Sequence, residues 1–299
     1  TWTDATNGFT RSVYLYSVYF IDSNNGWTVG ETGTIYKTTD GGTTWVEKAY
    51  GQMHALNSVD FVNSNTGWVV GSYGDIYNTT DGGESWTQQT APTDEALASV
   101  SFVDANNGWA IGFFANILRT TDGGTNWTQE TQGSIAGLEA VSFISAETGW
   151  AAGEQTVLKT SNGGDTWIEL ESTGIEHDIH SIYFLDANTG WSCGVFGKIY
   201  NTTDGGITWT LQTNQGDTHM WDIFFTDANI GYSIGGYGKI MKTTDGGSTW
   251  VSQTSNSSND LYGIYFIDAN TGWVSGYGGT VLKTVDGGAN CILQTTGST

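Results

Sequence analysis

The side chains best suited to chemistry recur at one aligned position of this sequence. Each follows an apolar residue, and successive members are 41 residues apart: Tyr16, Asn57, Ala98, Glu139, His180, Trp221 and Tyr262. A carboxylate, an imidazole, an amide and three large aromatic rings are groups that line concave binding sites for sugar rings or peptides. The spacing therefore predicts a ligand-binding site, provided that the fold brings these positions together.

The same groups admit two other interpretations. The aromatic side chains could instead fill a narrow channel or pack one structural unit against the next, because tyrosine and tryptophan often do so. A glycosidase would need two carboxylates about 5–10 Å apart across a sugar. The nearest candidates are Glu139, Asp178 and Asp222, which no local motif surrounds. We expect these carboxylates to be solvated loop charges, and no catalytic residue is predicted.

Neither a metal nor a cofactor is predicted. The histidines are His54, His177, His180 and His219, and their spacing does not match a zinc motif. A zinc site needs three or four convergent ligands, and only the second and third of these histidines are close in sequence. Turns such as Asp22–Gly26 faintly resemble calcium loops but lack the downstream glutamate.

Two further motifs share the 41-residue spacing and must position these side chains. An eight-residue motif reads TTDGGTTW at Thr38–Trp45, and its last copy, TVDGGANC at Thr284–Cys291, is degenerate. The other motif is a glycine followed by tryptophan or tyrosine, at positions 26, 67, 108, 149, 190, 231 and 272. Seven copies at a fixed period predict an array of one supersecondary unit.

Each unit contains four short segments with strand character. In the first unit they are Leu15–Asp22, Trp27–Gly30, Thr34–Thr39 and Thr43–Lys48, separated by turn residues. Four antiparallel strands in about 40–45 residues are typical of a propeller blade, and a closed ring leaves only short, protected sheet edges. We therefore predict an all-β fold: a seven-bladed β-propeller of four-stranded antiparallel blades.

The propeller is expected to be a single domain over residues 1–299. Its predicted blades are approximately 13–50, 54–91, 95–132, 136–172, 177–213, 218–254 and 259–296, and residues 1–12 supply a closing or exchanged strand.

The eight-residue motif resembles the Asp-box of sialidase-type repeats. With Phe-x-Asp-x-Asn-x-Gly-Trp at Phe20–Trp27, essentially the whole chain resembles the family of photosystem II assembly-factor-like propellers. That resemblance implies a propeller fold and an assembly role that uses a basic patch, whereas the corresponding surface here should be acidic. Sialidases need three arginines for the substrate carboxylate. This sequence has two, Arg11 and Arg119, so sialidase activity is not expected.

The aspartate of each Asp-box is expected to be structural. Its carboxylate can accept N–H bonds from its own turn, and the two following glycines permit a left-handed backbone. The seven positions are Asp40, Asp81, Asp122, Asn162, Asp204, Asp245 and Asp286, and asparagine can make the same turn without charge. The box tryptophan, such as Trp45, is expected to begin the outer strand and to pack between blades.

In a four-stranded meander, the Asp-boxes and the Gly-Trp turns lie on one face of the ring. The opposite face, here called the variable face, carries the second-to-third turns and the connections between blades. Its turns contribute Tyr73, Phe113, Phe114, Phe196, Tyr237 and Tyr277. At the channel mouth, Trp221, Tyr262 and Tyr16 should form an aromatic arc facing Glu139 and His180. All four histidines are expected on the inter-blade connections.

The charge balance restricts the partners. Nine Lys and Arg residues stand against 31 Asp and Glu residues, for a formal charge of −22. Such a surface repels phosphate backbones and anionic lipids, and no apolar run reaches membrane-spanning length. We expect neither nucleic-acid binding nor membrane insertion. The chain starts part-way through a repeat, which is typical of a processed mature end; we predict an extracellular or cell-surface location, with the periplasm as an alternative.

Two segments compete for the outer strand of the last blade. TWTDAT at Thr1–Thr6 resembles a fourth strand, and Asn290–Thr296 follows the degenerate box in which Cys291 replaces tryptophan. Thr1–Thr6 either pairs within its own chain, with Trp2 in the vacant position, or adds to a neighbouring molecule and builds a filament. Closure within one chain is favoured because it has no association cost.

These patterns predict a non-catalytic, secreted or cell-surface propeller that acts as a binding or assembly module. Its partner would be a protein or a glycan at the variable face, and the chain could also be a subunit of an extracellular fibre. The alternative is a carbohydrate-active enzyme, a glycoside hydrolase or lyase, with its site at the channel mouth.

Overall fold

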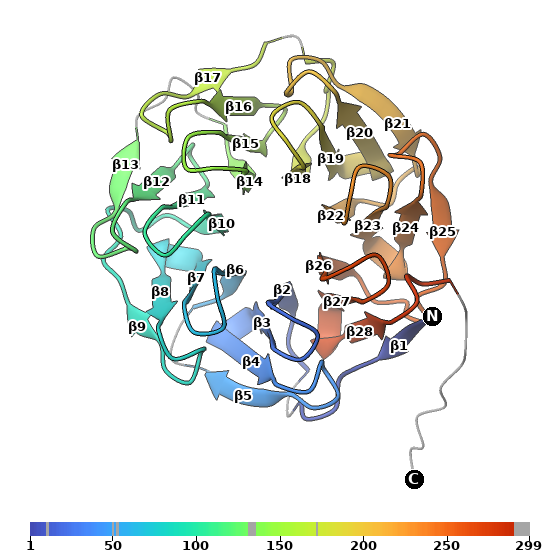
Figure 1. Cartoon of the computed structure of the whole chain (residues 1–299), viewed down its shortest axis with the longest axis horizontal. Coiled ribbons are helices and arrows are strands. Elements are labelled where there is room, and N and C mark those ends of the chain that lie inside the picture. Colours follow the sequence, from blue (N-terminus) through green and yellow to red (C-terminus); the bar gives the residue numbers. More distant parts are fainter. Residues whose placement is uncertain (10–11, 50, 52–53, 131–135, 172, 290–299) are drawn as a thin grey trace.

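The computed structural model describes residues 1–9, 12–49, 51, 54–130, 136–171 and 173–289. Over this part of the chain, seven four-stranded antiparallel sheets are arranged radially in a ring, with one strand of each sheet nearest the axis (Figure 1). The predicted all-β, seven-bladed propeller is confirmed. None of the helical segments in the described residues is long and apolar enough to cross a bilayer.

The first two strands of every blade form the interior of the ring. The inner strands are β2 (Leu15–Phe20), β6 (Leu56–Phe61), β10 (Leu97–Phe102), β14 (Leu138–Phe143), β18 (Ile179–Phe184), β22 (Met220–Phe225) and β26 (Leu261–Phe266). The second strands, buried along their whole length, are β3 (Gly26–Gly30), β7 (Gly67–Gly71), β11 (Gly108–Gly112), β15 (Gly149–Gly153), β19 (Gly190–Gly194), β23 (Gly231–Gly235) and β27 (Gly272–Gly276).

The third and fourth strands complete each blade toward its outer edge. The third strands are β4 (Thr34–Thr38), β8 (Ile76–Thr79), β12 (Ile117–Thr120), β16 (Val157–Thr160), β20 (Lys198–Thr202), β24 (Ile240–Thr243) and β28 (Val281–Thr284). The outer strands are β5 (Val46–Ala49), β9 (Thr87–Gln88), β13 (Thr128–Glu130), β17 (Ile168–Glu169), β21 (Thr210–Asn214), β25 (Val251–Gln253) and, for the last blade, β1 (Trp2–Asp4).

Short 3-10 turns join the second and third strands in five blades. They are η1 (Glu31–Gly33), η2 (Ser72–Gly74), η3 (Val195–Gly197), η4 (Gly236–Gly238) and η5 (Tyr277–Gly279).

The Asp-box turn delays the start of the outer strand. The sequence predicts that this strand begins at Thr43, whereas β5 begins at Val46. Asp40 Oδ1 accepts the Thr44 N–H at 2.8 Å, and Asp40 Oδ2 accepts the Thr44 hydroxyl at 2.6 Å. Because these local bonds hold the backbone in a turn, Trp45 precedes the outer strand instead of beginning it. Asn162 makes the same turn by accepting the Thr166 N–H at 3.0 Å.

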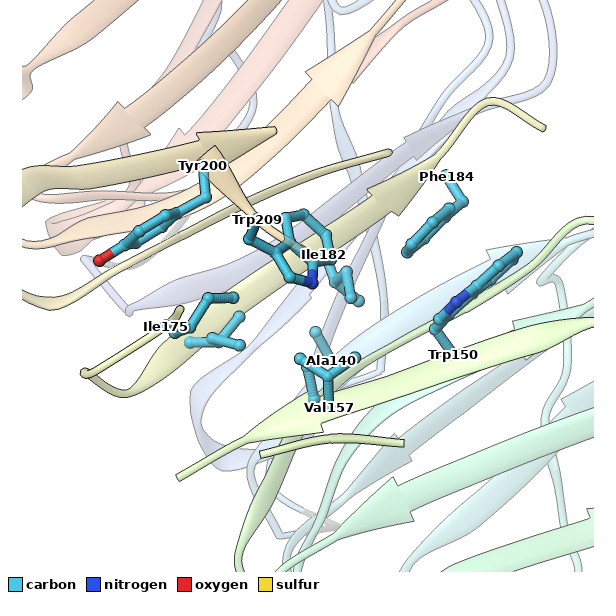
Figure 2. Close-up of a cluster of buried hydrophobic side chains, with 10 residues drawn as sticks. Ala140, Trp150, Val157, Ile175, Ile182, Phe184, Tyr200 and Trp209 are labelled. Atoms are coloured by element: carbon cyan, nitrogen blue, oxygen red, sulfur yellow. The ribbon is translucent and has the colours of Figure 1, made fainter. Parts of the chain in front are cut away.

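The tryptophan of each Gly-Trp motif connects its blade to the next one. The Trp27 ring stacks on Phe61 with centroids 3.6 Å apart, and Trp27 Nε1 donates to the Gly82 carbonyl at 3.0 Å. Figure 2 shows the equivalent rings of Trp150 and Phe184 between β15 and β18, which stack at 3.6 Å. The same pair of contacts joins every blade to its successor, with Tyr232 replacing tryptophan in the sixth.

The N-terminal segment completes the last blade of its own chain. β1 pairs with β28, and Trp2 lies opposite Thr284 (Figure 1). Trp2 is 1% exposed, and its ring meets Phe266 edge-to-face at 5.7 Å, as Trp45 meets Phe20 at 5.9 Å in the first blade. Trp2 thus occupies the position that the box tryptophan has in the other blades. The competing segment, Asn290–Thr296, lies outside the described residues.

Candidate functional site

A β-bulge in every inner strand sets the geometry of the channel mouth. In the first blade, Leu15 pairs with Gly30 and Ser17 with Val29, so Tyr16 is an extra residue without a partner in the ladder. The same register shift occurs in the other six blades. A bulge bends the strand and re-aims its side chains. The seven bulged residues are the variable positions found in the sequence.

These bulged residues surround one cavity of about 660 Å³. Its lining comprises all seven variable residues together with Tyr14, Ser17, Ser58, Ser99, Phe113, Ala140, Ser181 and Asp222. Cavities of this size accommodate small ligands or a few side chains of a peptide. The structure therefore brings the sequence-predicted site residues together at the mouth of the channel.

Sequence reasoning missed the second layer of this cavity. Strict strand alternation allows only one of two consecutive residues to face the channel, but the bulge lets both the second and the third residue of an inner strand line it. The third residues are small or polar at the same spacing: Ser17, Ser58, Ser99, Ala140, Ser181, Asp222 and Gly263. That periodic row of small residues was the available signal, because large side chains there would fill the channel.

The aromatic side chains at the mouth form a connected arc. Ring centroids are 5.8 Å apart for Tyr16 and Tyr262, 5.9 Å for Tyr262 and Trp221, and 4.5 Å for Trp221 and His180. The expectation that His180 faces this arc is wrong: His180 continues it, because the fifth and sixth blades are neighbours in the ring. His180 Nδ1 lies 2.6 Å from Glu139 Oε2, which extends the row to the fourth blade.

The histidines occupy different kinds of position. His180 lies within β18 and not on an inter-blade connection, because the inner strand starts one residue before it. His54, His177 and His219 precede inner strands as expected, and the His54 ring packs on Tyr73 at 4.4 Å. Within the described residues, no group of three or more His, Cys, Asp or Glu side chains could hold a metal ion.

The three candidate carboxylates have different surroundings. Asp222 is not a solvated loop charge: it lies in β22, and its oxygens accept the Ser181 hydroxyl at 2.7 Å, the Ile223 N–H at 2.8 Å and the Ile264 N–H at 2.9 Å. Burial raises the pKa of Asp222 to about 6. Asp178 precedes β18 and does not contribute to the cavity lining. Glu139 lines the cavity and contacts the His180 side chain of the next blade.

Asn57 links two neighbouring inner strands. Its amide donates to the Leu97 carbonyl of the next blade at 2.8 Å, although the residue also lines the cavity. Because its amide group already donates to this carbonyl, the side chain has fewer hydrogen-bonding groups left for a ligand.

Deeper in the channel, aromatic residues pack against one another. Centroids are 4.5 Å apart for Tyr19 and Tyr265, 5.1 Å for Tyr265 and Phe224, and 5.3 Å for Phe224 and Tyr183. The Tyr19 hydroxyl donates to the Phe61 carbonyl at 2.6 Å, and burial raises the pKa of Tyr183 to about 12. Contacts between aromatic rings thus characterise this deeper layer, whose residues the sequence analysis did not single out.

Asp60, in the same deeper layer, should make stability depend on pH. Its Oδ2 accepts the Phe102 N–H of the next blade at 2.6 Å, and burial raises its pKa to about 6. The ordinary aspartate pKa is about 3.9, so folding favours the protonated carboxyl. The corresponding stabilisation is complete below that ordinary value and is lost as the pH rises through about 6.

We therefore expect Asp60→Asn, which retains an acceptor for Phe102, to flatten the fall in unfolding free energy between pH 4 and 7. Urea unfolding of both proteins across this range measures the difference. Asp217→Asn, at an exposed position, serves as the control. Equal pH profiles for wild type and Asp60→Asn would contradict the assignment.

With this geometry in hand, comparisons with known proteins identify relatives. The family model described as photosynthesis system II assembly factor YCF48 matches residues 2–90, 84–216 and 210–293. A structure of YCF48 bound to D1 peptide aligns with a TM-score of 0.79 and 24% identity, covering 95% of this chain and 94% of that chain. YCF48 from Cyanidioschyzon merolae aligns with a TM-score of 0.78 and 24% identity, covering 95% of this chain and 98% of that chain.

A carbohydrate-active enzyme shares the fold at lower sequence identity. The GH74 xyloglucanase from Xanthomonas campestris aligns with a TM-score of 0.77 at 10% identity, covering 96% of this chain but 54% of the enzyme. At these identities, the structural alignments show a shared fold alone. A comparison with curated proteins finds no match.

Proposed function

This chain belongs to the family described as photosynthesis system II assembly factor YCF48, and from this premise we propose that it is a non-catalytic assembly module whose channel mouth binds a segment of another protein. The observation that carries the proposal is the convergence of seven bulged, variable side chains on one cavity of about 660 Å³. The repeats share what the ring needs, so the positions at which they differ within a shared cavity are the ones available for recognition.

The chemistry of the mouth suits a peptide. Tyr16, Trp221 and Tyr262 offer large, rigid contact areas, and aromatic residues of this kind are enriched at protein interfaces. Glu139 and His180 add hydrogen-bonding groups beside these rings. A structure of the relative YCF48 is described as bound to D1 peptide, which makes peptide binding by this shared fold a natural hypothesis for the present chain.

Catalysis has less support than binding. The oxygens of Asp222 are taken up by Ser181 and by two backbone N–H groups, and Glu139 is paired with His180. A glycosidase needs two free carboxylates on opposite sides of a sugar. Both carboxylates that line the mouth, Glu139 and Asp222, already have hydrogen-bonding partners within the protein.

Selection from a displayed library of random linear peptides tests the proposal. We expect the intact propeller to enrich a family of peptides, and an excess of a soluble selected peptide to displace them. A panel of neutral oligosaccharides is tested in parallel, with reducing-end release as the readout for hydrolysis. Binding of oligosaccharides without peptides would replace our proposal with glycan recognition, and their hydrolysis would replace it with catalysis.

The extracellular or cell-surface location and assembly into a fibre stay predictions. In this structure β1 already completes its own ring, so polymerisation would require the segment Thr1–Thr6 to leave β28 for a neighbouring molecule. Light scattering on the purified chain over a range of concentrations tests assembly, and fractionation of the native cells tests location. A concentration-independent monomer would end the fibre hypothesis.

A further inference from the structure

A chain of aromatic contacts runs along the variable face from the second-to-third turn of the seventh blade, through the channel mouth, to the same turn of the fifth blade. On one side of Tyr262 it continues to Tyr16 and then to Tyr14, whose ring centroid is 6.4 Å from that of Tyr16. It ends at the rim residue Tyr277, whose centroid is 4.6 Å from that of Tyr14. On the other side it continues to Trp221 and then to His219, whose ring centroid is 5.6 Å from that of Trp221. It ends at the rim residue Phe196, whose centroid is 6.2 Å from that of His219. We call these seven residues the aromatic track. It is long enough to contact several successive residues of an extended ligand.

The rim end of this track carries an unusual backbone feature. Phe196 has a φ of 57°, and its equivalents in the other second-to-third turns are Thr32, Tyr73, Phe114, Gln155, Tyr237 and Gly278, all with positive φ. A left-handed backbone is disfavoured for bulky residues, and glycine in the last blade shows that the turn accepts it. Yet Tyr73, Phe114, Phe196 and Tyr237 are 69%, 72%, 47% and 80% exposed. Because an exposed ring contributes little to packing, Phe196, which alone of these four belongs to the track, is better suited to contact with a partner.

Most basic side chains are engaged on the opposite face. Those of the third strands reach the Asp-box of the following blade: Lys283 Nζ donates to the Gly41 carbonyl at 2.6 Å, and Lys242 and Lys159 make equivalent bonds. Lys37 and Lys48 pair with Glu84, and Arg119 pairs with Asp165. Among the described residues, this leaves Lys198 and Lys239 as the basic side chains next to the second-to-third turns.

Carboxylates, in contrast, flank the track. Glu31 Oε2 accepts the Tyr14 N–H at 3.4 Å, and Asp260 Oδ1 accepts the Tyr237 N–H at 2.8 Å. Burial and the nearby Asp260 charge raise the pKa of Tyr262 to about 12. Glu139 adds a third carboxylate at the mouth. Aromatic faces bordered by carboxylates attract arginine and lysine side chains through cation–π and ionic interactions.

Building on the proposed function, we infer that the segment bound at the mouth is cationic, with arginine or lysine side chains lying over the aromatic track between Glu31, Glu139 and Asp260. This preference is the opposite of the one that a basic patch would produce. It gives the acidic composition of the variable face a specific role in partner selection, in addition to solubility.

The composition of the selected peptides tests this inference. After selection from the random library, we expect arginine and lysine to be enriched over their input frequencies and aspartate and glutamate to be depleted. The same selection is run on Trp221→Ala, which has the same net charge. Peptides enriched on both proteins bind through the overall negative charge, and they are removed from the wild-type set. The most enriched peptide is then synthesised with arginine, citrulline or glutamate at its basic positions. Fluorescence anisotropy should show about tenfold weaker binding for citrulline and a further loss for glutamate.

Matched variants locate the effect on the track. Glu31→Gln and Asp260→Asn should each weaken the arginine peptide several-fold and leave the citrulline peptide unchanged, whereas Glu147→Gln, on the Asp-box face, should change neither. Phe196→Gly should weaken binding, and Thr32→Gly, the same left-handed position without a ring, should not.

The outcomes separate this inference from the proposed function. If neutral or acidic peptides are enriched and lose binding on Trp221→Ala, the cationic preference is wrong and peptide binding at the mouth stands. If no peptide is enriched on the wild-type protein, both fail.

Discussion

Replacing Trp2 with alanine is expected to destabilise the propeller by about 3–5 kcal/mol, the usual cost of deleting a large buried aromatic side chain. Trp2 is 1% exposed and contacts Phe266 and Tyr232 edge-to-face at 5.7 and 6.5 Å. The change therefore leaves a cavity in the blade where the two ends of the ring meet. Urea unfolding followed by tryptophan fluorescence measures the loss.

The conservative variant Trp2→Phe serves as the control and should lose much less, because it retains most of the contact with Phe266. The unfolding midpoint should also be independent of protein concentration, since β1 pairs with β28 of its own chain. A midpoint that rises with concentration would indicate exchange of Thr1–Thr6 between molecules. An alanine variant as stable as wild type would show that Trp2 does not secure the ring.

At the binding site, Trp221→Ala is expected to reduce affinity for the selected peptide by about 2 kcal/mol or more, or roughly thirtyfold. Trp221 lies in the middle of the aromatic track, in contact with His180, His219 and Tyr262. Central aromatic residues in concave sites usually contribute most to binding. Isothermal titration calorimetry on the folded variant gives the change directly.

Tyr237→Ala is the matched control for this measurement. Tyr237 is on the same face and 80% exposed, but it has no ring contact with the track among the described residues. Its removal should change the affinity less than threefold, a difference within ordinary surface effects. Unaltered affinity in Trp221→Ala would place peptide binding elsewhere on the ring. Unfolding of both variants shows whether a loss of affinity arises from a loss of structure.

Local patterns in the chain were sufficient to predict the ring. The 41-residue period gives the number of blades, and each Asp-box turn forms from residues four apart, as in the bond from the Thr44 N–H to Asp40. The degenerate last box also pointed to the N-terminal strand, because Cys291 leaves a tryptophan position vacant. Such interactions depend on a few neighbouring residues, so the amino-acid sequence determines them almost without reference to the rest of the fold.

The functional surface, in contrast, depends on contacts between blades. The sequence listed the seven mouth residues, but only the tertiary structure placed His180 against Trp221 and Glu139, and bonded Asp222 to Ser181 and Ile264. These partners are about one repeat apart, so their contacts depend on how neighbouring blades are rotated and on the bulge at each inner strand. The bulge interrupts the simple alternation of strand residues. The closed ring, and not the local sequence pattern, therefore decided which side chains line the channel together.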